Sequence, residues 1–275
     1  MLKLQHLTKR FGAAPLFTDL CMEVDAPVVL WAPSGWGKTT LLRILMGLER
    51  PTTGSVEGVG RVAAVFQEDR LCPQLNAVQN VTLVLPGAEN QYKEQITSDF
   101  QQLGMGTAAL QLPARRLSGG QKRRVAIAGV MAMEPKILVL DEPAAGLDPE
   151  GRDTILSQIR NYHEQTGITV ILVSHSMEDI ARYANRVLVM SKAKVAMYDT
   201  VEKVFARAPE LLELGLSVPQ VTKIFLKLRE MGVDVPADVY TIPYAVKTLL
   251  EAKRRRDAGE SLVLPRSAAR KGGAV

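Results

Sequence analysis

The feature that most constrains this chain is a short loop near its N-terminus, set between two different hydrophobic patterns. Residues Val28–Trp31 form a continuous apolar run, which is typical of a buried strand. Over residues 39–48, leucines recur at the spacing of one helix face. Between them lies Ala-Pro-Ser-Gly-Trp-Gly-Lys-Thr-Thr, residues 32–40. A strand, a glycine-containing loop and a helix in this order predict a layered α/β domain.

The loop follows the phosphate-binding pattern except at its first position. Gly35 and Gly37 permit backbone torsions that turn successive N–H groups inward, and the start of the helix adds further donors. Lys38 can reach the β- and γ-phosphates, and the Thr39 hydroxyl can hold Mg²⁺. Ala32 stands where the pattern has a glycine, so a positive φ there would strain the loop. The predicted nucleotide-binding residues are Pro33, Ser34, Gly35, Trp36, Gly37, Lys38, Thr39 and Thr40.

Two carboxylates follow a second buried-strand pattern, over residues 137–140. Ligands of α/β sheets gather at the carboxyl ends of the strands, where Asp141 and Glu142 are expected. Asp141 can bind magnesium, and Glu142 can orient or deprotonate an attacking water, a role worth ~10²–10⁴ in rate. The alternative is a polar strand end stopped by Pro143; the phosphate loop argues against it.

A second glycine-containing helix start occurs at residues 117–121, Leu-Ser-Gly-Gly-Gln. Ser118 is a good N-cap, the glycines bare the backbone, and a helical pattern continues to Met133. A flexible linker is the alternative, which the immediate helix disfavours. The chain therefore contains two helix starts suited to phosphate.

This pentapeptide is the signature of ABC ATPases, and the chain resembles that family over residues 1–200. The resemblance implies a P-loop NTPase fold with an antiparallel β subdomain and a helical subdomain at about 71–133. It also implies that two ATP molecules lie between two subunits. Each signature, here Ser118, Gly119, Gly120 and Gln121, would then contact the γ-phosphate held by the other subunit's loop.

The resemblance implies roles for further residues. Gln67 matches the glutamine that senses Mg²⁺ and the attacking water, and His175 matches the histidine that contacts the γ-phosphate. Asp148 matches the loop that links the two sites across the dimer. Phe11 is placed like the aromatic that stacks on adenine, although a core phenylalanine explains it equally well. The expected catalytic residues are Glu142, His175 and Gln67, the metal ligands Thr39, Gln67 and Asp141, and the cofactors ATP and Mg²⁺.

The remaining patterns predict the layout of the chain. Residues 2–7 and 17–24 alternate as half-exposed strands do, 71–116 read as a partly helical insertion, and 169–173 as a strand. Residues 186–190 and 194–198 suggest a hairpin with a three-residue turn. Helices are expected after a Ser217 cap and near Thr241. We expect a largely parallel sheet covered on both faces, with an ATPase domain at 1–204, a helical module at 205–256 and a disordered tail at 257–275.

Composition bounds the class of protein. The chain has 275 residues, 47% of them apolar, which suits one α/β domain of roughly 200 residues and a small appendage. No secretory signal and no apolar run of ~18 residues occur, so a soluble or peripheral protein is expected. Cys21 and Cys72 show no metal-ligand spacing and suggest buried or half-buried thiols of a reducing compartment.

The net charge of +5 admits nucleic acid or an anionic membrane as partner, or a solvated tail, which we favour. Much of the excess lies at Lys253, Arg254, Arg255, Arg256, Arg266, Arg270 and Lys271.

From residue 117 onward, segments 117–148, 174–179 and 213–220 resemble ATPases of energy-coupling factor importers, which take up vitamins, cobalt or nickel. This implies a peripheral subunit at the cytoplasmic face of the cell membrane. Its partners would be a second ATPase subunit, a transmembrane coupling protein and a small membrane substrate-binding protein. The C-terminal helices would help the ATPases dimerise. Segments 65–71 and 78–81 look more like conventional importers for sulfonates or nitrate.

Three alternatives remain open on the sequence. The first is a conventional binding-protein-dependent importer ATPase. The second is a soluble ABC ATPase acting on DNA or ribosomes, supported only by the charge; we expect no nucleic-acid partner. The third is an ATP-binding adaptor without hydrolysis, which Ala32 favours and Glu142 and His175 disfavour. The transported substrate, and the choice between homodimer and heterodimer, are not encoded in this chain.

Overall fold

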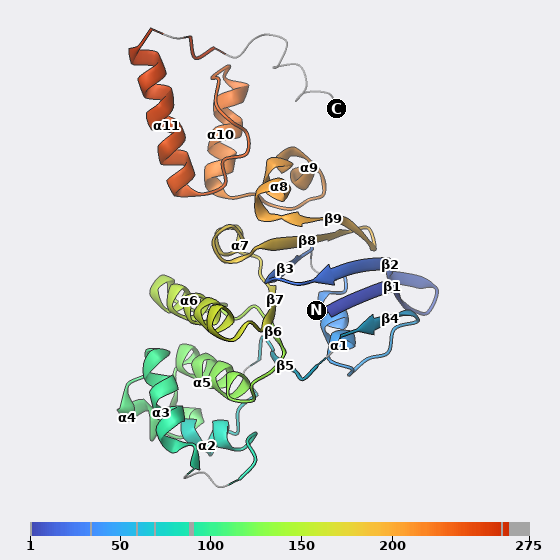
Figure 1. Cartoon of the computed structure of the whole chain (residues 1–275), viewed down its shortest axis with the longest axis vertical. Coiled ribbons are helices and arrows are strands. Elements are labelled where there is room, and N and C mark those ends of the chain that lie inside the picture. Colours follow the sequence, from blue (N-terminus) through green and yellow to red (C-terminus); the bar gives the residue numbers. More distant parts are fainter. Residues whose placement is uncertain are drawn as a thin grey trace.

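The centre of the molecule is a six-stranded sheet with the order β5-β6-β7-β3-β8-β9 (Figure 1). The computed structural model describes residues 2–33, 35–58, 60–68, 70–87, 91–259 and 261–263. The sheet consists of β3 (Val28–Trp31), β5 (Val62–Val65), β6 (Ile137–Asp141), β7 (Thr169–Val173), β8 (Arg186–Ser191) and β9 (Lys194–Thr200). All pairs are parallel except β8 with β9. The expectation of a largely parallel sheet is confirmed.

One face of this sheet is covered by a smaller antiparallel sheet and one helix. The smaller sheet has the order β2-β1-β4 and contains β1 (Leu2–Phe11), β2 (Ala14–Val24) and β4 (Thr53–Glu57). Leucines of α1 (Lys38–Leu45) and of β1 pack against alternate residues of the large sheet, such as Leu30 and Val139. The helix ends three residues earlier than expected because Gly47, at φ +71°, leaves the helical conformation.

The other face is covered by helices. Here α5 (Gly119–Met131), α6 (Pro149–Thr166), α7 (Met177–Tyr183), α8 (Val201–Ala206) and α9 (Ala208–Glu213) surround the alternate strand residues, including Val29 and Leu138. Successive residues of a strand point to opposite faces. Helices α1 and α5, which begin at the two glycine-containing segments, therefore lie on opposite faces of the large sheet.

The predicted helical insertion forms a small core of its own. It contains α2 (Ala77–Thr82), α3 (Lys93–Gln102), α4 (Thr107–Leu110) and the short 3₁₀ helix η2 (Ala114–Arg116). Phe100 and Ile96 of α3 pack with Val125 of α5, so the signature helix joins this insertion to the sheet. Neither β5 nor α7 was predicted, since each is short.

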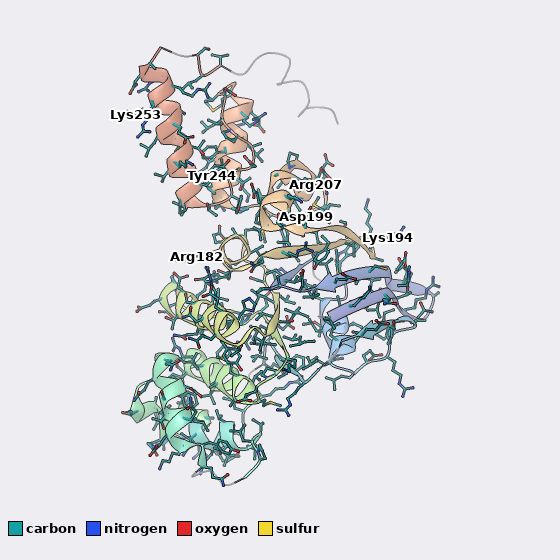
Figure 2. The ribbon with its side chains drawn as sticks, viewed as in Figure 1. Arg182, Lys194, Asp199, Arg207, Tyr244 and Lys253 are labelled. Atoms are coloured by element: carbon teal, nitrogen blue, oxygen red, sulfur yellow. The ribbon has the colours of Figure 1, made fainter. Side chains whose placement is uncertain are left out.

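The C-terminal part ends in α10 (Gln220–Glu230) and α11 (Ile242–Asp257), which pack around Phe225 and Val239. Pro219, not Ser217, occupies the N-cap of α10, so the predicted serine cap is wrong: the Ser217 hydroxyl donates to the carbonyl of Val218 instead. Thr241 caps α11 as the pattern suggested. Figure 2 places Tyr244 at one end of α11 and Lys253 toward the other.

A line of aromatic rings connects this part to the central sheet. The ring centroids of Trp31 and Phe205 are 6.1 Å apart, and those of Phe205 and Tyr240 are 5.6 Å apart in a stacked arrangement. Tyr244 completes the line with an edge contact to Tyr240. Trp31 is the last residue of β3, directly before the phosphate loop.

Several finer expectations need adjustment. The β8–β9 turn has two residues, Lys192 and Ala193, both with positive φ, rather than three.

Cys21 is exposed and only Cys72 is half-buried, so the expectation of two sheltered thiols is wrong for Cys21. Of the tail, residues 260 and 264–275, including Arg266, Arg270 and Lys271, lie outside the described residues. Within the described ranges, no helix has the length and apolar character needed to cross a bilayer.

Candidate functional site

Four neighbouring parallel strands end at one edge of the large sheet, and each is followed by predicted site residues. Gln67 comes two residues after β5, Asp141 ends β6, and His175 comes two residues after β7. The phosphate loop follows β3. Asp141 pairs with Val173, and Val173 pairs with Leu30, so the ends lie in register. The sheet therefore brings together residues that are far apart in the sequence.

The phosphate loop has the backbone that its glycines predict. Gly35 and Gly37 have φ of +82° and +84°. A Cβ on Gly37 would lie 2.7 Å from Cγ of Leu16, so a side chain does not fit there. Gly37 is also the N-cap of α1, and no side chain accepts from the first turn of the helix. Those N–H groups are available to an anion.

The strain expected at Ala32 does not arise. Ala32 is buried and is not one of the described residues with positive φ. A Cβ is therefore tolerated at this first position of the loop. Pro33, Trp36 and Thr40 are partly buried, Thr39 is exposed, and Ser34 lies outside the described residues.

Lys38 lies in the loop with its ammonium group held by backbone. Its Nζ donates to the carbonyls of Ala32, at 2.6 Å, and Pro33, at 3.2 Å. Burial lowers the pKa of Lys38, while the negative charges of Glu142 and Asp141 act in the opposite direction. Burial also raises the pKa of Asp141, against the effect of Lys38. The lysine and both carboxyl groups therefore share one electrostatic environment.

Glu142 has the most unusual environment of the predicted residues. Its φ is +52°, a conformation that costs a non-glycine residue free energy, and its N–H donates to Val173 at 3.0 Å. Its Oε1 is buried and accepts no hydrogen bond, although Nε2 of His175 lies 3.4 Å away. Burial raises the pKa of Glu142, His175 opposes this shift and Asp141 reinforces it.

A cavity of about 360 Å³ adjoins these groups and is lined by Glu142, Ser174 and His175 among others. Oε1 of Glu142, which accepts no hydrogen bond, fits a site that receives a polar ligand, because a buried carboxylate oxygen is normally hydrogen-bonded. Thr39, Gln67 and Asp141 supply the oxygen donors that Mg²⁺ prefers. The residues present therefore fit MgATP.

The second glycine-containing segment is built differently. Ser118 is the N-cap of α5, and its hydroxyl accepts from the N–H of Gln121 while the Gln121 side chain accepts from the N–H of Ser118. Ser118 and Gly119 are exposed, and Gly120 lies against Leu147. Asp148 caps α6 by accepting from Gly151 and is itself exposed. This segment faces outward, on the opposite side of the sheet from α1.

Arg123 is an important residue that the sequence patterns missed. It is 4% exposed, and its guanidinium donates to carbonyls of Phe66, Asp141, Glu142 and Pro143. The distances to Asp141 and Glu142 are both 2.7 Å. One side chain of the signature helix thus fixes the Gln67 segment and the Glu142 segment. Its position four residues before the buried Ile127 was the only signal.

Phe11 is exposed over 59% of its surface, so the alternative of a core phenylalanine is wrong. Nζ of Lys9 lies 4.8 Å from its ring centroid. An exposed aromatic ring at the end of β1 remains consistent with the proposed stacking on a base.

Comparison with known proteins decides the family. The ABC transporter family model matches residues 18–145. The energy-coupling factor transporter ATP-binding protein EcfA2 of Clostridium perfringens is 39% identical over 84% of this chain and 88% of its own length.

This chain belongs to the energy-coupling factor transporter ATP-binding proteins.

The energy-coupling factor ATPase also resembles solved members of its fold. The structure of cbiO1 from Clostridium perfringens, described as part of the ABC transporter complex cbiONQ, is 26% identical and aligns with a TM-score of 0.68. It covers 84% of this chain and 96% of that one. The dimeric bacterial ABC transporter cassette MJ0796 is 25% identical, with a TM-score of 0.66, 73% of this chain covered and 99% of that one.

Family membership confirms several expectations. The chain is an ABC-type ATPase, and its fold is that of the P-loop ABC cassettes. A match over 84% of the chain extends far beyond residues 117–275, so the likeness to the energy-coupling factor branch is not confined to the C-terminal half. The family implies membrane partners and a second ATPase subunit, and it weakens the sulfonate- or nitrate-importer alternative.

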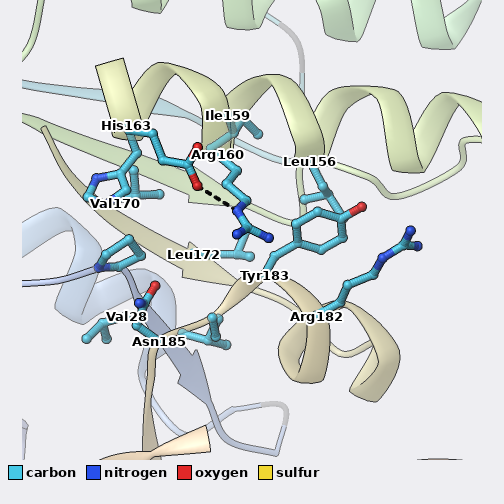
Figure 3. A pocket seen from close by; sticks show the side chains of 14 residues that line it. Val28, Leu156, Ile159, Arg160, His163, Val170, Leu172, Arg182, Tyr183 and Asn185 are labelled. Carbon is cyan, nitrogen blue, oxygen red and sulfur yellow. Dashed lines mark hydrogen bonds and ion pairs between the residues drawn. The ribbon is translucent and has the colours of Figure 1, made fainter. Parts of the chain in front are cut away.

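A second cavity, of about 320 Å³, lies away from these residues (Figure 3). It is lined by α6, α7 and the start of β3, with Arg160 and Tyr183 among its side chains. Arg160 pairs with Glu164 at 2.9 Å, and Arg182 pairs with Asp153. Of the described lining residues, both arginines already have a carboxylate partner, so neither guanidinium is free to bind a nucleotide.

Proposed function

We propose that the energy-coupling factor ATPase hydrolyses MgATP between two ATPase subunits, and that this drives a membrane importer. The observation that carries the proposal is the placement of its two phosphate-suited helix starts on opposite faces of one sheet. Because a single chain cannot present both to one phosphate group, the signature of one subunit would close the loop of the other.

The roles of the residues in the loop follow from their positions. The N–H groups at the start of α1 and the Lys38 ammonium would hold the β- and γ-phosphates. Lys38 would exchange its backbone carbonyl acceptors for phosphate oxygens, which are stronger partners for an ammonium group. Mg²⁺, held by Thr39, Asp141 and Gln67, would neutralise phosphate charge. Phe11 would stack on the adenine.

Glu142 and His175 would carry the chemical step. The Glu142 carboxylate would accept a proton from the attacking water at its unpartnered oxygen, and its raised pKa brings it closer to neutral pH, where a general base is most effective. His175 would contact the γ-phosphate and orient Glu142. Asp148 would link the two sites across the dimer.

The proposed assembly has four kinds of component. Two ATPase subunits, as a homodimer or a paralogous heterodimer, would sit at the cytoplasmic face of the cell membrane. They would bind a transmembrane coupling protein and a small membrane substrate-binding protein that captures vitamins or transition-metal ions. The segment beginning at Gln67 would contact the coupling protein, and α10 and α11 would support dimerisation.

The test is to purify the full-length chain from native membranes and identify its membrane partners. Recovery of a coupling protein and a small substrate-binding membrane protein supports the proposal. Recovery of a permease that works with a separate binding protein contradicts it and restores the conventional-importer alternative.

A second measurement adds MgATP to the Glu142→Gln protein, which should accumulate as a closed dimer in solution.

A further inference from the structure

Three potential metal ligands gather on the exposed face of the small antiparallel sheet, outside the residues assigned to nucleotide binding. Ligand atoms of His6, Asp19 and Cys21 all lie within 4.8 Å of one another. Nδ1 of His6 is 2.6 Å from Oδ1 of Asp19 and 3.7 Å from Sγ of Cys21. The side chains of His6 and Asp19 are 79% and 74% exposed. The cluster is therefore open to solvent.

Two bulges in the β1–β2 ladder create this cluster. Leu4 pairs with Met22 and Leu7 with Leu20, so β1 contains one extra residue at this point. Between the pairs Leu7–Leu20 and Lys9–Phe17, β2 contains one extra residue. His6 and Asp19 occupy these bulges with φ of +48° and +52°. Because the leucines stay buried, each bulge turns an additional side chain outward.

The donor set and its spacing suit a zinc-like ion. Imidazole nitrogen, carboxylate oxygen and thiolate sulfur are the ligands that Zn²⁺ takes in proteins. Tetrahedral Zn²⁺ with ordinary bond lengths places a nitrogen and a sulfur ligand roughly 3.6 Å apart, close to the 3.7 Å found here. The nitrogen and oxygen are at hydrogen-bond distance and would need to separate by less than roughly 1 Å.

Backbone hydrogen bonds already orient two of the ligands. The N–H of His6 donates to Sγ of Cys21 at 3.2 Å, which orients the sulfur. The N–H of Asp19 donates to the Thr8 hydroxyl at 3.0 Å, which fixes the bulge that carries the carboxylate. Sequence spacing could not reveal this arrangement, since residues 6 and 21 meet only through strand pairing.

We propose that His6, Asp19 and Cys21 bind one divalent transition-metal ion of the zinc class, with water in the fourth position. Binding would replace the hydrogen bond between His6 and Asp19 with two metal–ligand bonds. The Cys21 thiol would release its proton to solvent, as thiolate ligation requires. The ion would then link β1 to β2 without taking part in hydrolysis.

The experiment is a Co²⁺ titration of the full-length protein with MgATP present, followed by displacement with Zn²⁺. Cobalt bound to thiolate gives a charge-transfer band in the near ultraviolet, which reports sulfur ligation directly. The sequence contains two cysteines, so Cys21→Ser should abolish the band and Cys72→Ser should leave it intact. Asp19→Asn removes a direct ligand and should weaken binding by at least the roughly tenfold loss that follows when a ligand's hydrogen-bond partner is removed.

Two further readouts keep the result decisive. Zn²⁺ should raise the unfolding temperature of the wild type and of Cys72→Ser but not of Cys21→Ser, which separates metal binding from a folding defect. Glu142→Gln should leave the cobalt band unchanged, because His175 and Glu142 provide no sulfur. A wild type without a saturable band, or a band lost with Cys72→Ser instead, overturns the proposal.

Discussion

The two glycine-containing helix starts of this ATPase differ in how their first-turn N–H groups are satisfied. At α1, Gly37 leaves the first-turn N–H groups without a side-chain acceptor, and Lys38, Asp141 and Glu142 lie around the opening. At α5, Ser118 and Gln121 satisfy each other in a capping box, and no side-chain carboxylate of the described chain is bonded to residues 118–121. The first presents uncapped N–H donors and charged side chains to an anion, whereas the second satisfies its own cap.

This difference bears on the proposal that the signature of one subunit completes the phosphate loop of the other. The loop at α1 has charged side chains around it, and Oε1 of Glu142, the proposed base, accepts no hydrogen bond within the chain. The signature at α5 has exposed backbone and a neutral cap, and it lies across the sheet from α1. A surface of this kind suits the proposed role of completing a phosphate site that another subunit holds.

The largest effect is expected when two inactive variants are mixed. This experiment tests whether the loop of one subunit needs the signature of the other. Lys38→Ala should abolish phosphate binding at the loop, and Ser118→Glu should repel phosphate at the signature, so each protein alone should be inactive. A dimer of one chain of each kind contains one intact loop facing one intact signature. We expect ATPase activity to return on mixing, measured as phosphate release.

The control mixes the wild type with a chain that carries both changes. That dimer has no intact pair of loop and signature, so its activity should come only from residual wild-type dimers. If mixing the two single variants restores nothing although they dimerise, each site lies within one chain and the comparison drawn here fails.

Glu142→Gln addresses the base at the loop. The amide cannot accept the proton of the attacking water, so kcat should fall by about 10²–10⁴-fold while ATP affinity is retained. Steady-state phosphate release and equilibrium nucleotide binding measure the two quantities. Glu94→Gln, at an exposed glutamate of α3, is the matched control and should behave as the wild type. A normal turnover rate in Glu142→Gln would mean that another group is the base.

The pH dependence sharpens the same assignment. Burial raises the pKa of Glu142, and only the deprotonated carboxylate can serve as base. Activity should therefore decline on acidification at a pH above the ordinary glutamate value of about 4.3, by roughly tenfold per unit below the pKa. The measurement is kcat against pH at saturating MgATP, with a fold check at each pH. An acid limb at the ordinary value would contradict the effect of burial.

Arg123→Lys tests what α5 contributes inside the subunit. Lysine cannot reach all four carbonyls that the buried guanidinium satisfies, so the unfolding free energy should fall by about 1–3 kcal/mol. Turnover should also fall, because the Gln67 and Glu142 segments lose their common support. Arg116→Lys, at an exposed position before the signature, should change neither quantity. Denaturant unfolding and phosphate release measure both.

Much of this arrangement could be predicted because local patterns specify it. The apolar run Val28–Trp31 and the Ser118 cap of α5 each depend on neighbouring residues alone. The meeting of the phosphate loop and Asp141 at one edge of the sheet followed from the rule that parallel strands end on the same side.

The features that could not be predicted depend on contacts between distant segments. Arg123 reads as one of several basic residues after the signature, and its four acceptors come from segments 18 to 57 residues away in sequence. The bulges at His6 and Asp19 break the alternation of two strands, so no periodic pattern reveals them. The short strand β4 is mostly exposed and has no apolar signal.

The smallest expected effects are on stability. Ser118→Ala and Glu142→Gln should change the unfolding free energy in opposite directions. Ser118→Ala removes a cap and should lower the unfolding free energy by roughly 1 kcal/mol. Glu142→Gln removes a carboxyl group whose pKa is higher in the folded than in the unfolded state. Such a group destabilises the fold once pH exceeds the unfolded pKa, so the change should raise the unfolding free energy at pH 7.

That gain should shrink as the pH is lowered toward the ordinary glutamate pKa, since the folded carboxyl group is then already neutral. Thermal unfolding of both variants and the wild type at several pH values measures the pair of effects. If Glu142→Gln is destabilised at pH 7 as Ser118→Ala is, the Glu142 carboxylate is satisfied within the subunit. The loop at α1 would then be as self-contained as the signature, and its need for a ligand would lose its physical basis.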